Sequence, residues 1–142
     1  MDDAYTPRPV SRWYMAGAVL SLALMTFAVA ASAMRLATDP STLPLDERAQ
    51  VQAEPMWLVV LFALAAVAGA AGGLMLVLRR RAAEPLLLVA LAGAALWFVG
   101  LFVSPLRDLL ATGQIAGAAA LVAVAWTIFW FARHSRQRGW LR

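Results

Sequence analysis

Four stretches of the chain contain no acidic, basic or histidine side chain, and each is long enough to cross a membrane as a helix. They cover residues 13–34, 56–78, 85–103 and 114–132 and are 19 to 23 residues long. At about 1.5 Å of rise per residue, helices of this length match a hydrocarbon core of roughly 30 Å. Membrane-spanning strands would be about 10 residues long and alternate in polarity, and the sequence shows no such alternation. We therefore predict an all-α integral membrane protein, a bundle of four transmembrane helices.

The four spans define a single membrane domain with short ends. A chain of 142 residues has room for about one domain. We assign residues 13–132 to this domain, residues 1–12 to an N-terminal tail, and residues 133–142 to a basic C-terminal tail. The pair Ser104-Pro105 after the third span is typical of a helix start. It predicts that the fourth helix begins directly behind it and bends at Gly113.

The loop at residues 35–55, between the first two spans, contains a signal for a short additional helix. Pro44 is suited to open this helix and Pro55 to end it. One face of the helix would be apolar, which suits a position on the membrane surface or against a partner protein. The residues that share this face are Leu45, Ala49 and Ala53.

The arginines predict an orientation for the bundle. All 12 basic residues are arginine; nine of them lie in the two tails or between the second and third spans, and three lie on the other side. Because cytoplasmic segments of membrane proteins carry the excess of basic residues, we predict that both termini are cytoplasmic and that residues 35–55 face outward. The arginines that set this topology, and that are also placed to attract anionic lipid headgroups, include Arg79, Arg80, Arg81, Arg133, Arg136 and Arg138.

Composition supports the membrane assignment and excludes several function classes. Hydrophobic residues make up 63% of the chain and charged residues 14%, whereas soluble domains average roughly 45–50% and about 25%. In so apolar a chain, a net charge of +4 favours membrane orientation over nucleic-acid binding.

The tryptophans fall into two groups by their depth in the spans. Indole and phenol rings prefer the headgroup level of a membrane, and we assign to this interfacial belt Trp13, Tyr14, Trp57 and Trp130. Trp97 and Trp126 lie deeper in the third and fourth spans. Because a buried indole N–H needs an acceptor, we expect these two side chains to contact a neighbouring helix or a bound lipid.

Small residues recur at spacing four in three of the spans, a pattern that lets two helix backbones approach closely. The residues that carry it are Gly17 and Ser21, then Ala65, Gly69 and Gly73, then Gly113 and Gly117. Packing within the bundle is the favoured interpretation. An interface between two copies of the chain is the alternative, because small residues serve both equally.

Reactive side chains are absent from the spans. Proton relays, ion-coupled transporters and intramembrane hydrolases need an ionisable group at membrane depth, and the chain has no cysteine and one histidine, His134. That histidine lies beside Arg133 after the fourth span, where we expect it to be solvated and not a metal or haem ligand. We therefore predict no catalytic residue, no metal and no cofactor.

Two segments resemble a group of uncharacterised inner-membrane proteins, common in alphaproteobacteria, that often carry an automatic "sugar transporter" label. The likeness lies in the segment at residues 37–57, from Ala-Thr-Asp-Pro to Glu-Pro-Met-Trp, and in the run at residues 70–81, which ends in three arginines; it continues into the third span. It implies a four-helix protein of the bacterial inner membrane. The first span departs from the group, and the spans lack the polar residues that a sugar site requires.

The function expected from these observations is non-catalytic. We expect an accessory or structural subunit, or an assembly partner, of a larger respiratory or photosynthetic membrane complex, in contact with membrane lipids and with other subunits or a second copy. The alternative is a small carrier or channel for a neutral or lipidic solute. An intramembrane enzyme ranks last, because its reactive groups would have to come from loop residues such as Asp39, Asp46, Glu47 or Asp108.

Overall fold

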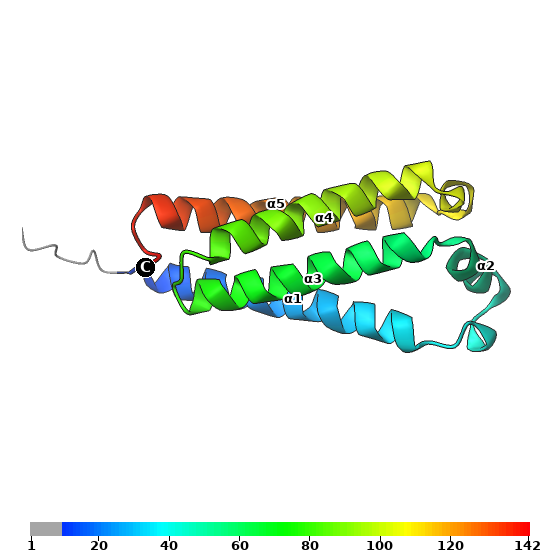
Figure 1. Cartoon of the computed structure of the whole chain (residues 1–142), viewed down its shortest axis with the longest axis horizontal. Coiled ribbons are helices and arrows are strands. Elements are labelled where there is room, and N and C mark those ends of the chain that lie inside the picture. The colour runs from blue at the N-terminus through cyan, green and yellow to red at the C-terminus, as the bar shows by residue number, and fades with distance from the viewer. Residues whose placement is uncertain (1–9) are drawn as a thin grey trace, which may run out of the picture.

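A computed structural model describes residues 10–142, and this part of the chain is all-helical (Figure 1). The elements in chain order are α1 (Arg12–Ala37), the 3₁₀-helix η1 (Pro40–Thr42), α2 (Leu45–Ala53), α3 (Met56–Val77), α4 (Ala83–Val103), the 3₁₀-helix η2 (Pro105–Leu109) and α5 (Thr112–Gln137). Residues 1–9, which include most of the predicted N-terminal tail, lie outside the described residues. The all-α prediction is confirmed for the rest.

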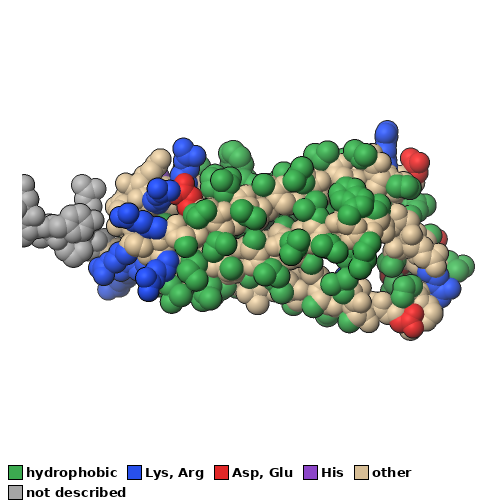
Figure 2. Space-filling view, viewed as in Figure 1, with side chains coloured by type: hydrophobic (Ala, Val, Ile, Leu, Met, Phe, Trp, Pro, Cys, Tyr) green, Lys and Arg blue, Asp and Glu red, His purple; other side chains and the backbone are tan. Residues whose placement is uncertain are grey.

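Four of the helices, α1, α3, α4 and α5, are long and apolar enough to cross a membrane, which indicates a multi-pass membrane protein. They lie side by side in one elongated bundle (Figure 1). The main helix–helix interfaces join α1 to α3, α3 to α4, and α4 to α5. Residues 10–12, 78–82 and 138–142 gather at one end, which we call the arginine end; Figure 2 shows its cluster of basic side chains. Residues 38–55 and 104–111 form the opposite end, which we call the α2 end.

The helices begin and end close to the predicted boundaries, with one correction. The short helix predicted between Pro44 and Pro55 is present as α2. The fourth long helix does not begin directly after Pro105: residues 105–109 form the separate turn η2, and Leu110 and Ala111 are extended (ψ 126° and 150°). The reason is that these two extended residues interrupt the helical hydrogen-bond pattern before α5 starts at Thr112. Gly113 consequently lies in the first turn of α5 and marks no bend within it.

The arginine end is closed by two helix C-termini that bind to each other. Both α3 and α5 end in a Schellman motif with a left-handed residue, Arg79 (φ 58°) and Gly139 (φ 72°). The backbone N–H of Arg142 donates to the carbonyl of Arg79 (2.7 Å), and the N–H of Arg81 donates to the carbonyl of Arg142 (3.0 Å). The Arg79 Nε also donates to the carbonyl of Trp140 (3.2 Å). The last residues of the chain are thereby fixed against the α3–α4 turn.

Tyr14 lies at the centre of the packing at this end. It is enclosed by protein, whereas we predicted an interfacial side chain at the headgroup level. Its side chain is 1% exposed, stacks on Phe131 of α5 and meets the edge of Trp140 (ring centroids 5.7 and 5.6 Å apart). Its hydroxyl donates to the Leu76 carbonyl on α3 (2.6 Å). The C-terminal residues that fold back over this ring are the reason why it is enclosed by protein.

The small residues of α1 and α3 are used for close packing inside the bundle. A Cβ at Gly73 would lie 2.9 Å from the Cα of Leu22 on α1, and a Cβ at Gly69 would lie 2.5 Å from the sulfur of Met25. Ala65 is buried against Gly93 of α4. Ser21 is buried and donates to a carbonyl of its own helix, at Gly17 (2.7 Å).

Gly113 and Gly117 show the same small-residue spacing but do not pack against a neighbouring helix of the bundle. A Cβ at Gly113 or at Gly117 would meet nothing within 4 Å. The packing within the bundle that their spacing favours is therefore not seen for these two residues. For them the alternative, an interface with another molecule, stays a prediction.

Candidate functional site

α1 and α5 touch at the arginine end and separate toward the α2 end. At the arginine end, a Cβ at Gly17 of α1 would lie 2.9 Å from the ring of Phe131 on α5. Beyond this contact the two helices are not among the main packed pairs of the described residues. The bundle is thus open along one of its four sides.

This open side leads into a cleft of about 320 Å³. All four long helices contribute to its walls. Its exposed lining side chains lie on α1 and α5, at Leu24, Phe27, Leu121 and Val124, whereas those at Ala65, Ala66 and Ala90 on α3 and α4 are buried, so α3 and α4 form the floor. The lining residues are Leu24, Met25, Phe27, Ala28, Ala31, Phe62, Ala65, Ala66, Ala90, Ala94, Leu121, Val124 and Ala125.

The cleft is apolar, and alanine makes the room for it. Every lining side chain is aliphatic, aromatic or a thioether, and seven of the thirteen are alanine. A cavity without polar partners does not hold ordered water, and it binds apolar molecules instead. Its volume lies at the lower end of the range of about 300–1,000 Å³ for ligand pockets.

The two sides of the cleft continue toward the α2 end with different chemistry. On α1, Arg35 follows Ala31 by four residues and so lies on the same face, one turn beyond the lining residues. On α5, Gly117 precedes Leu121 by four residues, and Gly113 precedes it by eight. Beyond the end of the cleft, α1 therefore presents a cationic side chain, whereas α5 presents two glycines that leave its backbone accessible.

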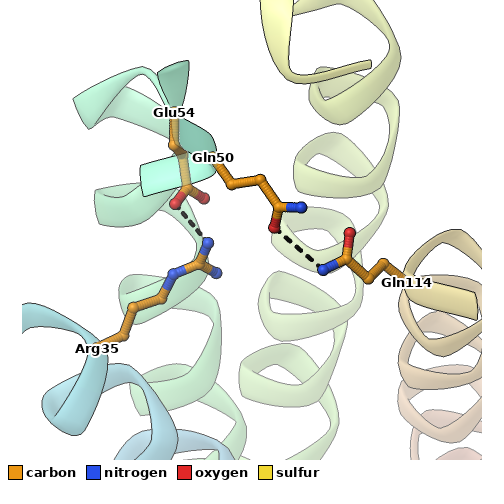
Figure 3. Close-up of polar contacts among 4 residues, drawn as sticks. All are labelled: Arg35, Gln50, Glu54 and Gln114. Carbon is orange, nitrogen blue, oxygen red and sulfur yellow. Dashed lines mark hydrogen bonds and ion pairs between the residues drawn. The ribbon is translucent and has the colours of Figure 1, made fainter. Parts of the chain in front are cut away.

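Polar contacts close the α2 end above the cleft (Figure 3). The Gln50 amide on α2 donates to the Leu109 carbonyl of η2 and accepts from the side-chain amide of Gln114 on α5 (both 3.0 Å). The Gln114 side chain in turn accepts from the Ala111 N–H, which caps the start of α5 (3.1 Å). These bonds fix α2 over the end of the bundle.

An ion pair joins α1 to the start of α3 at this end. The Arg35 Nη2 lies 2.6 Å from Oε2 of Glu54, whose side chain is 3% exposed, while the side chain of Arg35 is 43% exposed. Burial raises the pKa of Glu54, and the positive charge of Arg35 partly opposes this rise. The other oxygen, Oε1, has no hydrogen-bond partner among the described residues; Figure 3 shows the pair of Arg35 and Glu54.

Trp97 contacts a neighbouring helix, as its depth predicts, but its indole N–H has no acceptor among the described residues. The side chain is 7% exposed and packs against Phe62 of α3, with ring centroids 4.8 Å apart. Because Phe62 lines the cleft, Trp97 supports the cleft wall from behind.

The other predicted contact residues are spread over the surface. Four tryptophans are exposed, and none of them lines the cleft: Trp13, Trp57, Trp126 and Trp130. Trp126, which we expected to contact a helix or a lipid, is 60% exposed. His134 stacks on Trp130 (5.3 Å between centroids), and within residues 10–142 no three histidine or acidic side chains are grouped to hold a metal.

Most of the basic residues gather at the arginine end, away from the cleft. Arg136 pairs with Glu84 of α4, and the guanidinium of Arg138 lies over the ring of Trp140. Arg80, Arg81 and Arg133 are exposed at the same end.

The cleft itself was not predicted from the sequence. Its signal was the abundance of alanine on facing positions of four spans, a pattern that equally describes close packing. Comparison with known proteins adds no functional information, because no family model, no curated protein and no solved structure matches the chain. The resemblance to the inner-membrane group stays a prediction.

Proposed function

We propose that this chain is a non-catalytic, multi-pass membrane protein that holds one lipid-like molecule between α1 and α5. This is the lipidic form of the carrier function that the sequence left as an alternative. The observation that supports it is the 320 Å³ apolar cleft, which opens sideways between two helices. A sideways opening admits a molecule directly from the membrane.

Packing supplies the driving force for such binding. A membrane-dissolved chain is already in an apolar environment, so it gains little hydrophobic free energy on entering the protein. The lining side chains of an empty cleft, however, lack contact partners on one side, and a chain that fills the cleft restores these dispersion contacts. Alanines at the lining positions leave room for this chain, whereas leucines would fill it.

A second candidate is the assembly function: an accessory subunit of a larger complex in the bacterial inner membrane, with both termini in the cytoplasm. The feature that favours it is the start of α5, where Gly113 and Gly117 face open space. A helix of another subunit, or of a second copy, can approach such a surface closely.

The proposed function is tested by what remains bound after gentle purification. Native mass spectrometry of the protein from mild detergent is expected to show one lipid-like molecule per chain. The double variant Ala28→Leu, Ala31→Leu fills the cleft and is expected to lose this molecule. The matched control, Ala30→Leu, alters an exposed residue of the same helix that does not line the cleft and is expected to keep it. An unliganded mass for the wild type, or equal retention in all three proteins, would contradict the proposal.

A further inference from the structure

We propose that the molecule in the cleft is a phospholipid of the leaflet on the α2 side, with one acyl chain in the cleft and its phosphate at Arg35. This inference rests on the proposed function and adds the class of ligand and the residue that recognises its headgroup. Three observations support it: the position of the cleft along α1, its volume and the charge one turn beyond its end.

The cleft, together with the turn of α1 that separates it from Arg35, spans about one leaflet. Its lining residues on α1 begin at Leu24, in the middle of the helix, and Arg35 lies one turn beyond the last of them. Leu24 and Arg35 are eleven residues apart, which at about 1.5 Å per residue is about 16 Å along the helix. Half of a hydrocarbon core of roughly 30 Å is about 15 Å. A chain that starts at the headgroup level beside Arg35 therefore reaches the middle of the bilayer at Leu24.

The volume of the cleft, about 320 Å³, is of the size that holds a small apolar molecule or one hydrocarbon chain. The cleft is also about twice as large as an apolar cavity of about 150 Å³ that takes benzene. The second acyl chain of a phospholipid would stay outside, in the bilayer in front of the α1–α5 opening.

The charge at the end of the cleft is suited to a phosphate. The guanidinium of Arg35 contacts Glu54 through Nη2, and Nε and Nη1 make no hydrogen bond to other described residues. Glu54 is enclosed and holds one edge of the guanidinium, while 43% of the Arg35 side chain is exposed. A planar guanidinium fixed in this way presents two N–H donors to phosphate oxygens.

The test compares two lipids that share their acyl chains and differ in the phosphate: dioleoyl phosphatidylglycerol and dioleoylglycerol. Each is added to delipidated protein in detergent, and bound lipid is measured by native mass spectrometry. We expect the wild type to prefer phosphatidylglycerol by about tenfold, which corresponds to about 1.4 kcal/mol. The double variant Arg35→Gln, Glu54→Gln removes the ion pair without leaving an unpaired buried carboxylate, and it should lose the preference. Arg107→Gln, at an exposed arginine of the same end, is the matched control and should retain it.

The outcomes separate this inference from the proposed function. Equal binding of both lipids by the wild type, or an unchanged preference in the Arg35 variant, would overturn the phospholipid assignment while a lipid-like occupant survives. Binding of neither lipid, with an unliganded mass before delipidation, would overturn both. If a helix of another protein subunit can be cross-linked to the residues that line the cleft, the phospholipid assignment and the proposed function are both overturned, in favour of the assembly function.

Discussion

The hydroxyl of Tyr14, in the first turn of α1, donates a 2.6 Å hydrogen bond to the carbonyl of Leu76 near the end of α3. This bond and the ring of Phe131 tie α1 to its two neighbours at the arginine end. Toward the α2 end, α1 packs on α3 and leaves α5. The bundle is thus fixed at one end and open at the other, and the predictions below address these two ends separately.

Removal of the Tyr14 hydroxyl should destabilise the fold without affecting the cleft. Tyr14→Phe loses one buried hydrogen bond, for which we expect a loss of about 1 kcal/mol in the free energy of unfolding. The control is Ser135→Ala, because that buried hydroxyl bonds only to a carbonyl of its own helix, at Phe131, an interaction that contributes little to stability. Thermal unfolding in detergent measures both variants. Equal loss of stability in the two variants would show that the hydrogen bond from Tyr14 to α3 stabilises the fold no more than a bond within one helix.

At Arg79 we expect the left-handed backbone to lower the stability of the fold and the side-chain hydrogen bond to raise it. Arg79→Ala loses the bond from Nε to the Trp140 carbonyl and keeps a Cβ at a φ of 58°. Arg79→Gly loses the same bond but removes the left-handed strain, which costs about 1 kcal/mol for a residue with a Cβ. The glycine variant should therefore be more stable than the alanine variant by about this amount. Urea unfolding of the two proteins gives the difference directly, and an alanine variant as stable as the glycine variant would contradict it.

Two glycines of one motif should respond in opposite directions to alanine. Gly73→Ala places a methyl group 2.9 Å from the Cα of Leu22, so α1 must move and we expect a loss of at least about 1 kcal/mol. Gly117→Ala meets open space and should raise stability by about 0.5–1 kcal/mol, because alanine is the better helix former. Thermal unfolding of both variants in one detergent tests this contrast. Destabilisation by Gly117→Ala would indicate that a partner is already packed against this face.

Glu54 should make stability depend on pH. Burial raises its pKa in the folded protein above the ordinary 4.5, so folding takes up a proton between the unfolded and the folded pKa. The stability of the wild type should therefore fall, relative to Glu54→Gln, as the pH rises above the ordinary carboxyl pKa of 4.5. Arg35→Gln removes the charge that opposes the shift and should extend the decline to higher pH. Chemical unfolding at several pH values measures these differences. If the stability of the wild type relative to Glu54→Gln instead rises with pH, the pKa of Glu54 is lowered in the folded protein.

The proposed orientation is accessible to cysteine labelling, because the chain has no native cysteine. Ser41→Cys lies in the loop between α1 and α2, and Gln137→Cys lies at the exposed end of α5. A membrane-impermeant maleimide applied to intact cells with a permeable outer membrane should label the first and spare the second. In inverted inner-membrane vesicles the labelling should be reversed, and the opposite result in both preparations would invert the topology.

The sequence predicts the four long helices well, because apolar runs of 19 to 23 residues match the thickness of a membrane and are typical of transmembrane helices. It predicts the side-chain environments less well, because these depend on residues distant along the chain. Tyr14 occupies a belt position in its span, yet Trp140 encloses it from the other end of the chain. Position within a span therefore gives depth but does not distinguish lipid-facing from buried rings.

The candidate site could not be predicted for a related reason. Arg35 and Glu54 are 19 residues apart, and their pairing depends on how α2 folds back over the bundle. Gly73 and Gly117 belong to the same spacing pattern, yet Gly73 packs against Leu22 of α1 and Gly117 meets nothing within 4 Å. The difference depends on which helices become neighbours in the fold, and so does the cleft; no local sequence pattern records this.

The central claim, that the cleft between α1 and α5 is a lipid site, is tested most directly by an experimental density map of the protein in a lipid nanodisc. The account predicts a continuous, chain-like density between the two helices, from the level of Leu24 to a larger headgroup density beside Arg35. A map in which α1 packs against α5 along its whole length, or in which a helix of another molecule fills the space, would contradict it.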